Sequence, residues 1–78
     1  MTDSKPARTL LDIPLQCPST IAQVNVESDW LAAVGIEAGE KVIVLRKAPF
    51  GGPLHIRTET GGEFAIGRPL GDSILMED

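Results

Sequence analysis

The chain is poor in the residues from which active sites and ligand grooves are usually built. Its 78 residues include one histidine, one cysteine, no tyrosine and only three aromatic residues, Trp30, Phe50 and Phe64. The single cysteine, Cys17, permits no internal disulfide, so the apolar core must hold the domain together, as is typical of proteins from a reducing compartment. Proline-rich peptides are recognised in grooves lined by aromatic side chains, which this composition does not supply.

Basic residues and long apolar runs are also scarce. Seven Lys and Arg stand against eleven Asp and Glu, which gives a net charge of −4, and there is no basic run. Binding to nucleic acid or to anionic lipid depends largely on Lys and Arg, so we expect neither a nucleic-acid partner nor direct membrane insertion. No apolar run approaches the roughly 20 residues of a membrane span, and the polar start lacks the apolar segment of a signal peptide. The sequence predicts a soluble cytoplasmic protein.

Candidate catalytic groups are few and isolated. His55 alternates with apolar neighbours that face inward, so its side chain is expected to face solvent, and Cys17 lies in a loop. A Cys–His nucleophilic pair also needs a group that orients the base, and none is suggested. The glycine pairs Gly51-Gly52 and Gly61-Gly62 lack the spacing of a phosphate-binding loop, and each precedes a strand instead of a helix. The sequence therefore indicates neither an enzyme nor a nucleotide-binding protein.

The pattern of apolar residues predicts an all-β domain with one short helix. Residues 1–9 form a polar lead that we expect to be disordered, and residues 10–78 form the domain, which begins with an apolar segment interrupted by Pro14. A short helix is expected at Trp30–Val34, with Ser28 as its N-cap and Gly35 just after its end. Strands are expected at Thr20–Val26, Lys41–Lys47, Leu54–Thr58, around Phe64 and Ile66, and at Ser73–Met76. Five short strands without a repeat are typical of a small, partly open β-barrel.

The apolar positions of the expected strands also predict which residues form the core. In Thr20–Val26 the alternation places Ala22, Val24 and Val26 on one face, and the run in Lys41–Lys47 is predicted to be buried on both faces. The core is predicted to consist of Val24, Val26, Val42, Val44, Leu54, Ile56, Phe64, Ile66 and Ile74.

The segment between the second and third predicted strands has an unusual composition. It reads Ala48-Pro49-Phe50-Gly51-Gly52-Pro53, with two prolines and two glycines in six positions. Proline fixes φ and glycine reaches positive φ without a steric penalty, so the composition predicts one particular loop shape, with φ above zero at Gly51 or Gly52. Phe50 at its centre either folds onto the barrel or is presented to a partner, and the sequence leaves both open.

Several of these segments together resemble the ferrous iron transport protein A (FeoA) family, over nearly the whole chain. The segments are Leu10-Leu11-Asp12-Ile13-Pro14, Leu31-x-x-Val34-Gly35-Ile36-x-x-Gly39-x-x-Val42-x-Val44, Ala48-Pro49-Phe50-Gly51-Gly52-Pro53-Leu54, Phe64-Ala65-Ile66-Gly67-Arg68 and Ile74. The resemblance implies an SH3-like five-stranded β-barrel in the bacterial cytoplasm. It also implies an accessory role beside ferrous iron transport protein B, the membrane permease for ferrous iron, which carries a GTPase domain. Family members commonly begin the helix with arginines, where this chain has Ser28-Asp29-Trp30.

The resemblance leads to a leading hypothesis and an alternative. The leading hypothesis is a non-enzymatic module that docks on the permease through Pro49, Phe50, Gly51, Gly52 and Pro53, with Trp30 as a second anchor and self-association left open. The alternative is an iron carrier or sensor related to the SH3-like domain of iron-dependent repressors. A ferrous site would require imidazole and carboxylate ligands together, and the chain offers only His55 with Glu59 and Glu63 across a hairpin, so we predict no metal site and no cofactor.

Overall fold

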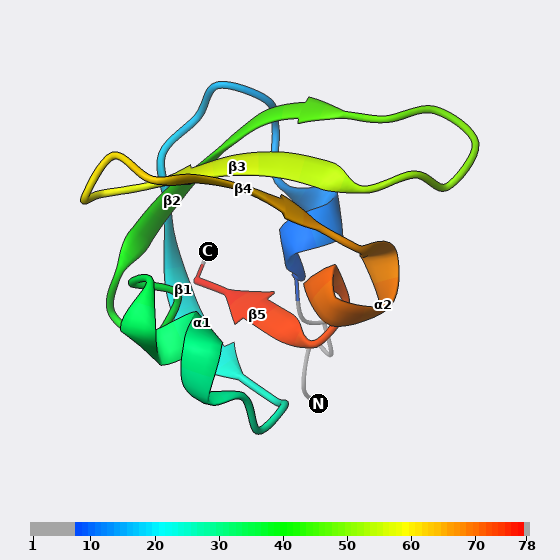
Figure 1. The fold of residues 1–78 in the computed structure, drawn as a ribbon. Helices are drawn as coiled ribbons and strands as arrows, with labels where there is room; N and C mark the ends of the chain where they lie inside the picture. Colours follow the sequence, from blue (N-terminus) through cyan, green and yellow to red (C-terminus); the bar gives the residue numbers. More distant parts are fainter. Residues whose placement is uncertain (1–7, 78) are drawn as a thin grey trace, which may run out of the picture.

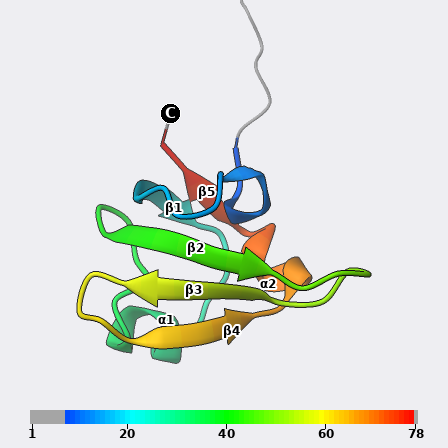
Figure 2. The same cartoon turned by 90° about the horizontal axis from the view of Figure 1, so that it is seen from above.

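Five short antiparallel strands curve around one apolar core in the computed structural model, which describes residues 8–77 (Figures 1 and 2). Each strand pairs only with its neighbours in the order β4-β3-β2-β1-β5. The edges β4 and β5 are not paired with each other, so the barrel is partly open, as the sequence predicts. The strands are β1 (Ser19–Val24), β2 (Lys41–Lys47), β3 (Leu54–Thr58), β4 (Glu63–Ile66) and β5 (Ile74–Met76).

Three single helical turns close the gaps between the strands. A 3₁₀ turn, η1 (Leu10–Asp12), precedes β1, α1 (Asp29–Ala33) joins β1 to β2, and α2 (Arg68–Gly71) joins β4 to β5. The segment around Pro69 is a short α-helix, with Pro69 in its first turn, where a missing N–H costs nothing. Within residues 8–77, no helix reaches the length and hydrophobicity needed to cross a membrane.

The first described residues belong to the barrel. Thr9 caps η1 by a reciprocal pair of hydrogen bonds with Asp12, and it forms an isolated bridge with Leu75 of β5. The carbonyl oxygen of Arg8 accepts a hydrogen bond from the backbone N–H of Met76 at 2.8 Å. The barrel therefore includes Arg8 and Thr9, which the sequence assigns to the lead, while Met1 to Ala7 lie outside the described residues.

Helix α1 ends as the sequence predicts. Gly35 follows it with φ +91°, the backbone N–H of Ile36 donates to the carbonyl oxygen of Leu31 at 2.8 Å, and that of Gly35 donates to Ala32. These two bonds, with the buried pair Leu31 and Ile36, form a Schellman motif. Ser28 does occupy the N-cap position, but its side chain makes no capping hydrogen bond.

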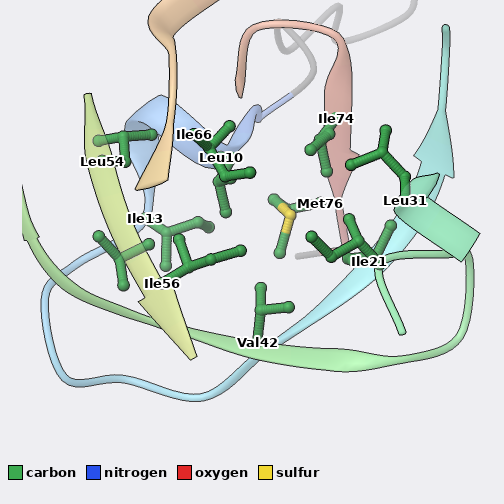
Figure 3. Close-up of a cluster of buried hydrophobic side chains, with 12 residues drawn as sticks. Leu10, Ile13, Ile21, Leu31, Val42, Leu54, Ile56, Ile66, Ile74 and Met76 are labelled. Carbon is green, nitrogen blue, oxygen red and sulfur yellow. The ribbon is translucent and has the colours of Figure 1, made fainter. Parts of the chain in front are cut away.

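Twelve apolar side chains form the core and converge on the barrel axis (Figure 3). Six of the nine predicted core residues are fully buried, Val24 and Phe64 are partly buried, and Val26 is wrong because 39% of it is exposed. Its strand ends at Val24, so Val26 lies beyond the sheet. The buried set is Leu10, Ile13, Ile21, Leu31, Ile36, Val42, Val44, Leu54, Ile56, Ile66, Ile74 and Met76.

The predicted alternation in the first strand is also wrong. Ile21 is fully buried and Ala22 is exposed. The cause is a register shift in the pairing of β1 with β5 between Ile21 and Gln23, because a bulge of this kind moves later residues to the other face.

The run in β2 is buried on one face only, and not on both as predicted. Val42 and Val44 face the core, while Ile43 and Leu45 stay partly exposed. The barrel is a single sheet curled around its core, so the outer face of β2 is turned toward solvent.

Candidate functional site

The loop between β2 and β3, residues 48–53, projects beyond the body of the barrel (Figure 2). Both views place it at the end of the molecule away from α1 (Figures 1 and 2). The two strands that carry it are the most extensively paired in the sheet, with partners from Val42↔Thr58 to Lys47↔Leu54. The loop is therefore carried by the two strands with the longest pairing, which is interrupted by a register shift between Val44 and Arg46.

The loop backbone is a tight turn with an unusual conformation. The backbone N–H of Gly52 donates to the carbonyl oxygen of Pro49 at 3.1 Å, and that of Ala48 donates to Pro53 at 3.0 Å. Between them, φ is +58° at Phe50 and +76° at Gly51, the signs that a type I′ turn requires at its two central positions. Gly51 confirms the expectation of positive φ. Phe50 was not expected there, since a left-handed conformation costs a residue with a Cβ roughly 1–2 kcal/mol.

The Phe50 side chain is completely exposed, with a relative accessibility of 104%. The interpretation in which Phe50 folds onto its own barrel is therefore wrong. Its side chain adds no burial to the fold, and its backbone is strained, so this residue does not serve the stability of the domain. Strained positions that the surrounding structure holds in place are often functional.

The glycines of the loop serve two different purposes. At Gly51 a side chain would have free space, and the constraint is the positive φ alone. At Gly52 an added Cβ would lie 2.7 Å from the Cβ of Ala48 and 3.2 Å from the carbonyl oxygen of Pro49. Gly52 therefore permits the close approach of the two loop arms, and Gly51 permits the turn.

Arg68 holds the base of the loop, and sequence reasoning did not assign it a role. Its Nε donates to the carbonyl oxygen of Gly52 at 3.0 Å and its Nη2 donates to that of Ala48 at 3.3 Å, both in a partly buried setting. Gly67 and Pro69 place Arg68 in the first turn of α2, directly after β4. The only sequence signal was its position at the end of the family segment Phe64–Arg68, since nothing in the chain indicates a contact with residues 48–53.

Trp30 does not share a surface with Phe50. It lies on α1, at the other end of the barrel (Figure 2). Its ring is 47% exposed and packs against Phe64 at a centroid distance of 6.5 Å and an interplanar angle of 54°. The three aromatic residues therefore form no common groove, and a partner that touched both Trp30 and Phe50 would have to span the barrel.

The residues considered for a metal site are engaged elsewhere. His55 is adjacent to Arg46, whose Nη2 lies 3.5 Å from its Nδ1. Glu63 pairs with Arg57 at 3.0 Å, and Glu59 accepts the backbone N–H of Lys41 at 3.3 Å. No cluster of three or more potential metal ligands occurs in the part of the chain that the structure describes. Cys17 is exposed, and its Sγ lies 4.0 Å from the carbonyl oxygen of its neighbour Pro18.

Solved structures with the same fold include FeoA proteins and a manganese-dependent transcriptional repressor. An iron uptake regulatory protein (FeoA) aligns with a TM-score of 0.77 at 22% identity, over 94% of this chain and 97% of the other. FeoA of Stenotrophomonas maltophilia complexed with zinc, described as a procaryotic SH3 domain protein, gives 0.74 at 23% identity over 91% of each chain. A manganese-dependent transcriptional repressor gives 0.75 at 23% identity over 95% of this chain and 37% of the repressor.

These alignments confirm the SH3-like five-stranded fold. No curated protein sequence matches the chain at a significant level. The sequence model of the FeoA domain matches residues 8–78. Because this match extends over nearly the whole chain, the protein belongs to the FeoA family.

Proposed function

We propose that this chain is a non-enzymatic accessory protein of ferrous iron uptake that docks on the ferrous iron permease through the β2–β3 loop. The contact residues are Pro49, Phe50, Gly51, Gly52 and Pro53. Membership of the FeoA family supports the role in iron transport. Two of the aligned structures carry matching descriptions. One is named an iron uptake regulatory protein, and the other is proposed to act as a bacterial ferrous iron transport activating factor.

The observation that carries the proposal is the completely exposed Phe50 at φ +58°. Aromatic residues that enter a pocket on the partner often dominate the energy of an interface. A loop backbone that is already held in one shape loses little freedom on binding, so less of the interaction energy is spent on ordering it. The bonds from Arg68 to Ala48 and Gly52 keep the loop in that shape before any partner arrives.

Membership of the FeoA family supports the choice of partner. In this proposal the chain acts in the cytoplasm and reaches the inner membrane through the permease, a membrane protein that carries a GTPase domain. Accessory action of this kind needs no catalytic group. We therefore propose that the chain acts by binding to the permease and that this binding supports the activity of the permease.

The carrier or sensor hypothesis has weaker support in the described residues. A divalent cation at His55 would lie beside the guanidinium of Arg46, which repels it, and recruiting Glu63 would break its ion pair with Arg57. The likeness to a manganese-dependent repressor extends to the fold alone. Docking is the function that the loop geometry supports best.

Co-purification with the permease tests the proposal. Cells lacking their own copy of the gene would express the tagged wild-type chain, Phe50→Ala or the control Val26→Ala, which removes another exposed apolar side chain. We expect the wild type and Val26→Ala to recover the permease and to restore ferrous iron uptake, and Phe50→Ala to do neither while keeping its melting temperature.

Three other results would contradict the proposed docking surface or the proposed partner. Recovery of the permease by Phe50→Ala at the wild-type level would show that the loop is not the docking surface. Loss of recovery only in Trp30→Ala would place the contact at α1 instead. If the wild-type chain recovers no permease under conditions that preserve the membrane complex, the proposed partner is wrong.

A further inference from the structure

The end of the barrel that carries Phe50 is positively charged, although the chain as a whole is acidic. Arg46 and Lys47 end β2 directly before the loop, and Arg68 contacts the loop from the other side. The sequence from Arg46 to Thr58 contains no Asp or Glu. Three cations therefore surround the base of the loop, in a chain whose net charge is −4.

These three cations have no carboxylate partner within the barrel. Among residues 8–77 the only ion pair joins Arg57 and Glu63. Arg68 donates to loop carbonyl oxygens, and Lys47 Nζ donates to the carbonyl oxygen of Leu11 at 2.8 Å. Asp12, which follows Leu11, accepts hydrogen bonds from Thr9 and forms no ion pair with Lys47. None of the three cations at the loop base is therefore paired with a carboxylate among residues 8–77.

The acidic residues of the same hairpin lie at its other end. Glu40 precedes β2, Glu59 follows β3, and Glu63 begins β4. These three acids outnumber the two cations at that end, Lys41 and Arg57. The two ends therefore differ in charge, which can orient the barrel toward a partner before contact. The apolar tip and the positive charge occur at the same end, so one binding event would engage both.

We propose that the surface receiving Phe50 is an apolar pocket on a protein partner, rimmed by Asp and Glu side chains. This inference rests on the proposed function and adds the chemistry of the partner site. Interfaces commonly have an apolar centre and a polar rim, and here Phe50 supplies the centre while Arg46 supplies an exposed cation at the rim. Carboxylates on the partner would satisfy a charge that the barrel leaves unpaired.

A shaped protein pocket fits these observations better than an anionic lipid surface. The tip offers one apolar side chain, whereas stable attachment to a bilayer usually needs more than one anchoring signal. Its conformation is also fixed, by positive φ at Phe50 and by the two bonds from Arg68. A fluid bilayer gains nothing from a fixed shape, whereas complementarity to a pocket depends on it.

The test compares two charges at opposite ends of the same strand. Arg46 and Lys41 are both exposed residues of β2, and Lys41 lies at the end away from the loop. The affinity of the full-length permease in detergent would be measured at about 50 mM and 300 mM NaCl for the wild type, Arg46→Gln, Arg46→Lys and Lys41→Gln. We expect Arg46→Gln to weaken binding at low salt by about two- to five-fold, the range of one exposed ion pair.

The other variants should behave differently. Arg46→Lys keeps the charge and should bind as the wild type does, and Lys41→Gln should leave affinity unchanged although it alters net charge equally. The wild-type affinity should fall as salt rises, and Arg46→Gln should show the smaller fall, because salt screens exposed charges. Unchanged affinity in Arg46→Gln, with Phe50→Ala still abolishing binding, would overturn this inference and leave the proposed function standing.

Two further results would assign the tip to another occupant. Binding to vesicles of phosphatidylcholine with about 30% phosphatidylglycerol that is lost in Phe50→Ala would identify a membrane site. Self-association in sedimentation velocity that is lost in both Phe50→Ala and Arg46→Gln would identify a second copy of the chain. Failure of the wild-type chain to bind the permease at all would overturn the proposed function, and this inference with it.

Discussion

The Nε of Arg68 donates to the carbonyl oxygen of Gly52 at 3.0 Å, across a separation of 16 residues in the chain. This bond ties the start of α2 to the loop between β2 and β3. The same guanidinium reaches the carbonyl oxygen of Ala48, so one side chain contacts both arms of the turn. The fixed fork of donors in arginine suits such a double contact, which a lysine ammonium could not make in the same geometry.

Removing this contact should loosen the loop more than it destabilises the barrel. Replacing Arg68 with Gln takes away the charged donors from two partly buried carbonyl oxygens, for an expected loss of about 1–2 kcal/mol in the free energy of unfolding. Hydrogen exchange would follow the amides of Ala48 and Gly52, which are both bonded within the loop. We expect these amides to exchange faster in Arg68→Gln, and in Arg68→Lys to a lesser degree.

A matched control for this measurement is Arg57→Gln. Arg57 forms an exposed ion pair with Glu63, and such pairs contribute little to stability because solvent screens them. The loop amides should keep their wild-type exchange rates in this variant. Equal exchange in Arg68→Gln and the wild type would show that the strands alone hold the loop.

Phe50→Asn should stabilise the fold and impair function. Asparagine tolerates left-handed φ far better than phenylalanine, and Asn-Gly is the preferred sequence for a type I′ turn. Because the Phe50 side chain is fully exposed, its loss removes no buried contact. We expect unfolding in urea to show a gain of roughly 0.5–1 kcal/mol, on the scale of the relieved strain, together with a loss of permease binding. A clear decrease in stability would mean that Phe50 supports the fold.

The sequence predicted the strands of the barrel better than the details of the loop. The strand positions followed from runs such as Lys41–Lys47, since alternation and β-branching are local signals. Ile21 was missed because a bulge changed the phase of β1, and Leu10 and Ile13 were missed because their burial depends on packing against distant strands.

The composition of residues 48–53 identified the loop, but it did not predict the orientation of the Phe50 side chain or the contact with Arg68. Two prolines and two glycines predicted a fixed turn, and Gly51 confirms it. Whether Phe50 would face the barrel or the solvent could not be read from residues 48–53, because this depends on how far the hairpin extends beyond the core. The contact with Arg68 joins segments that no sequence pattern relates.

Replacing either Gly51 or Gly52 with valine should alter the loop, but for a different reason at each position. Gly51→Val places a β-branched residue at φ +76°, with a strain of roughly 1–3 kcal/mol, but meets no neighbouring atom. Gly52→Val forces the loop arms apart, because its Cβ would lie 2.7 Å from that of Ala48. We expect native-like circular dichroism for both variants and reduced iron uptake, with the larger chemical-shift changes at Ala48 in Gly52→Val. Full uptake in the double variant would make the loop shape irrelevant.

Gly71→Ala should destabilise the barrel itself. A Cβ at this buried position in α2 would lie 3.0 Å from Cδ2 of Leu11 and 3.2 Å from Cδ1 of Leu54. Overpacking of this kind costs roughly 1–3 kcal/mol, and we expect a loss of about 1 kcal/mol because both neighbours are flexible leucine ends. A melting temperature for Gly71→Ala equal to that of the wild type would contradict close packing at Gly71.

His55→Ala and Cys17→Ser should leave ferrous iron uptake intact, because a binding role for the chain requires neither residue. His55 faces the cationic Arg46, and the exposed Cys17 has only a local contact with Pro18, so neither belongs to a group able to hold Fe²⁺. Uptake would be measured in cells lacking their own copy, with protein abundance checked by immunoblot. Anaerobic titration calorimetry with Fe²⁺ should show no tight stoichiometric binding to the wild type. Loss of uptake in either folded, abundant variant, accompanied by tight Fe²⁺ binding to the wild type, would favour an iron carrier over a docking module.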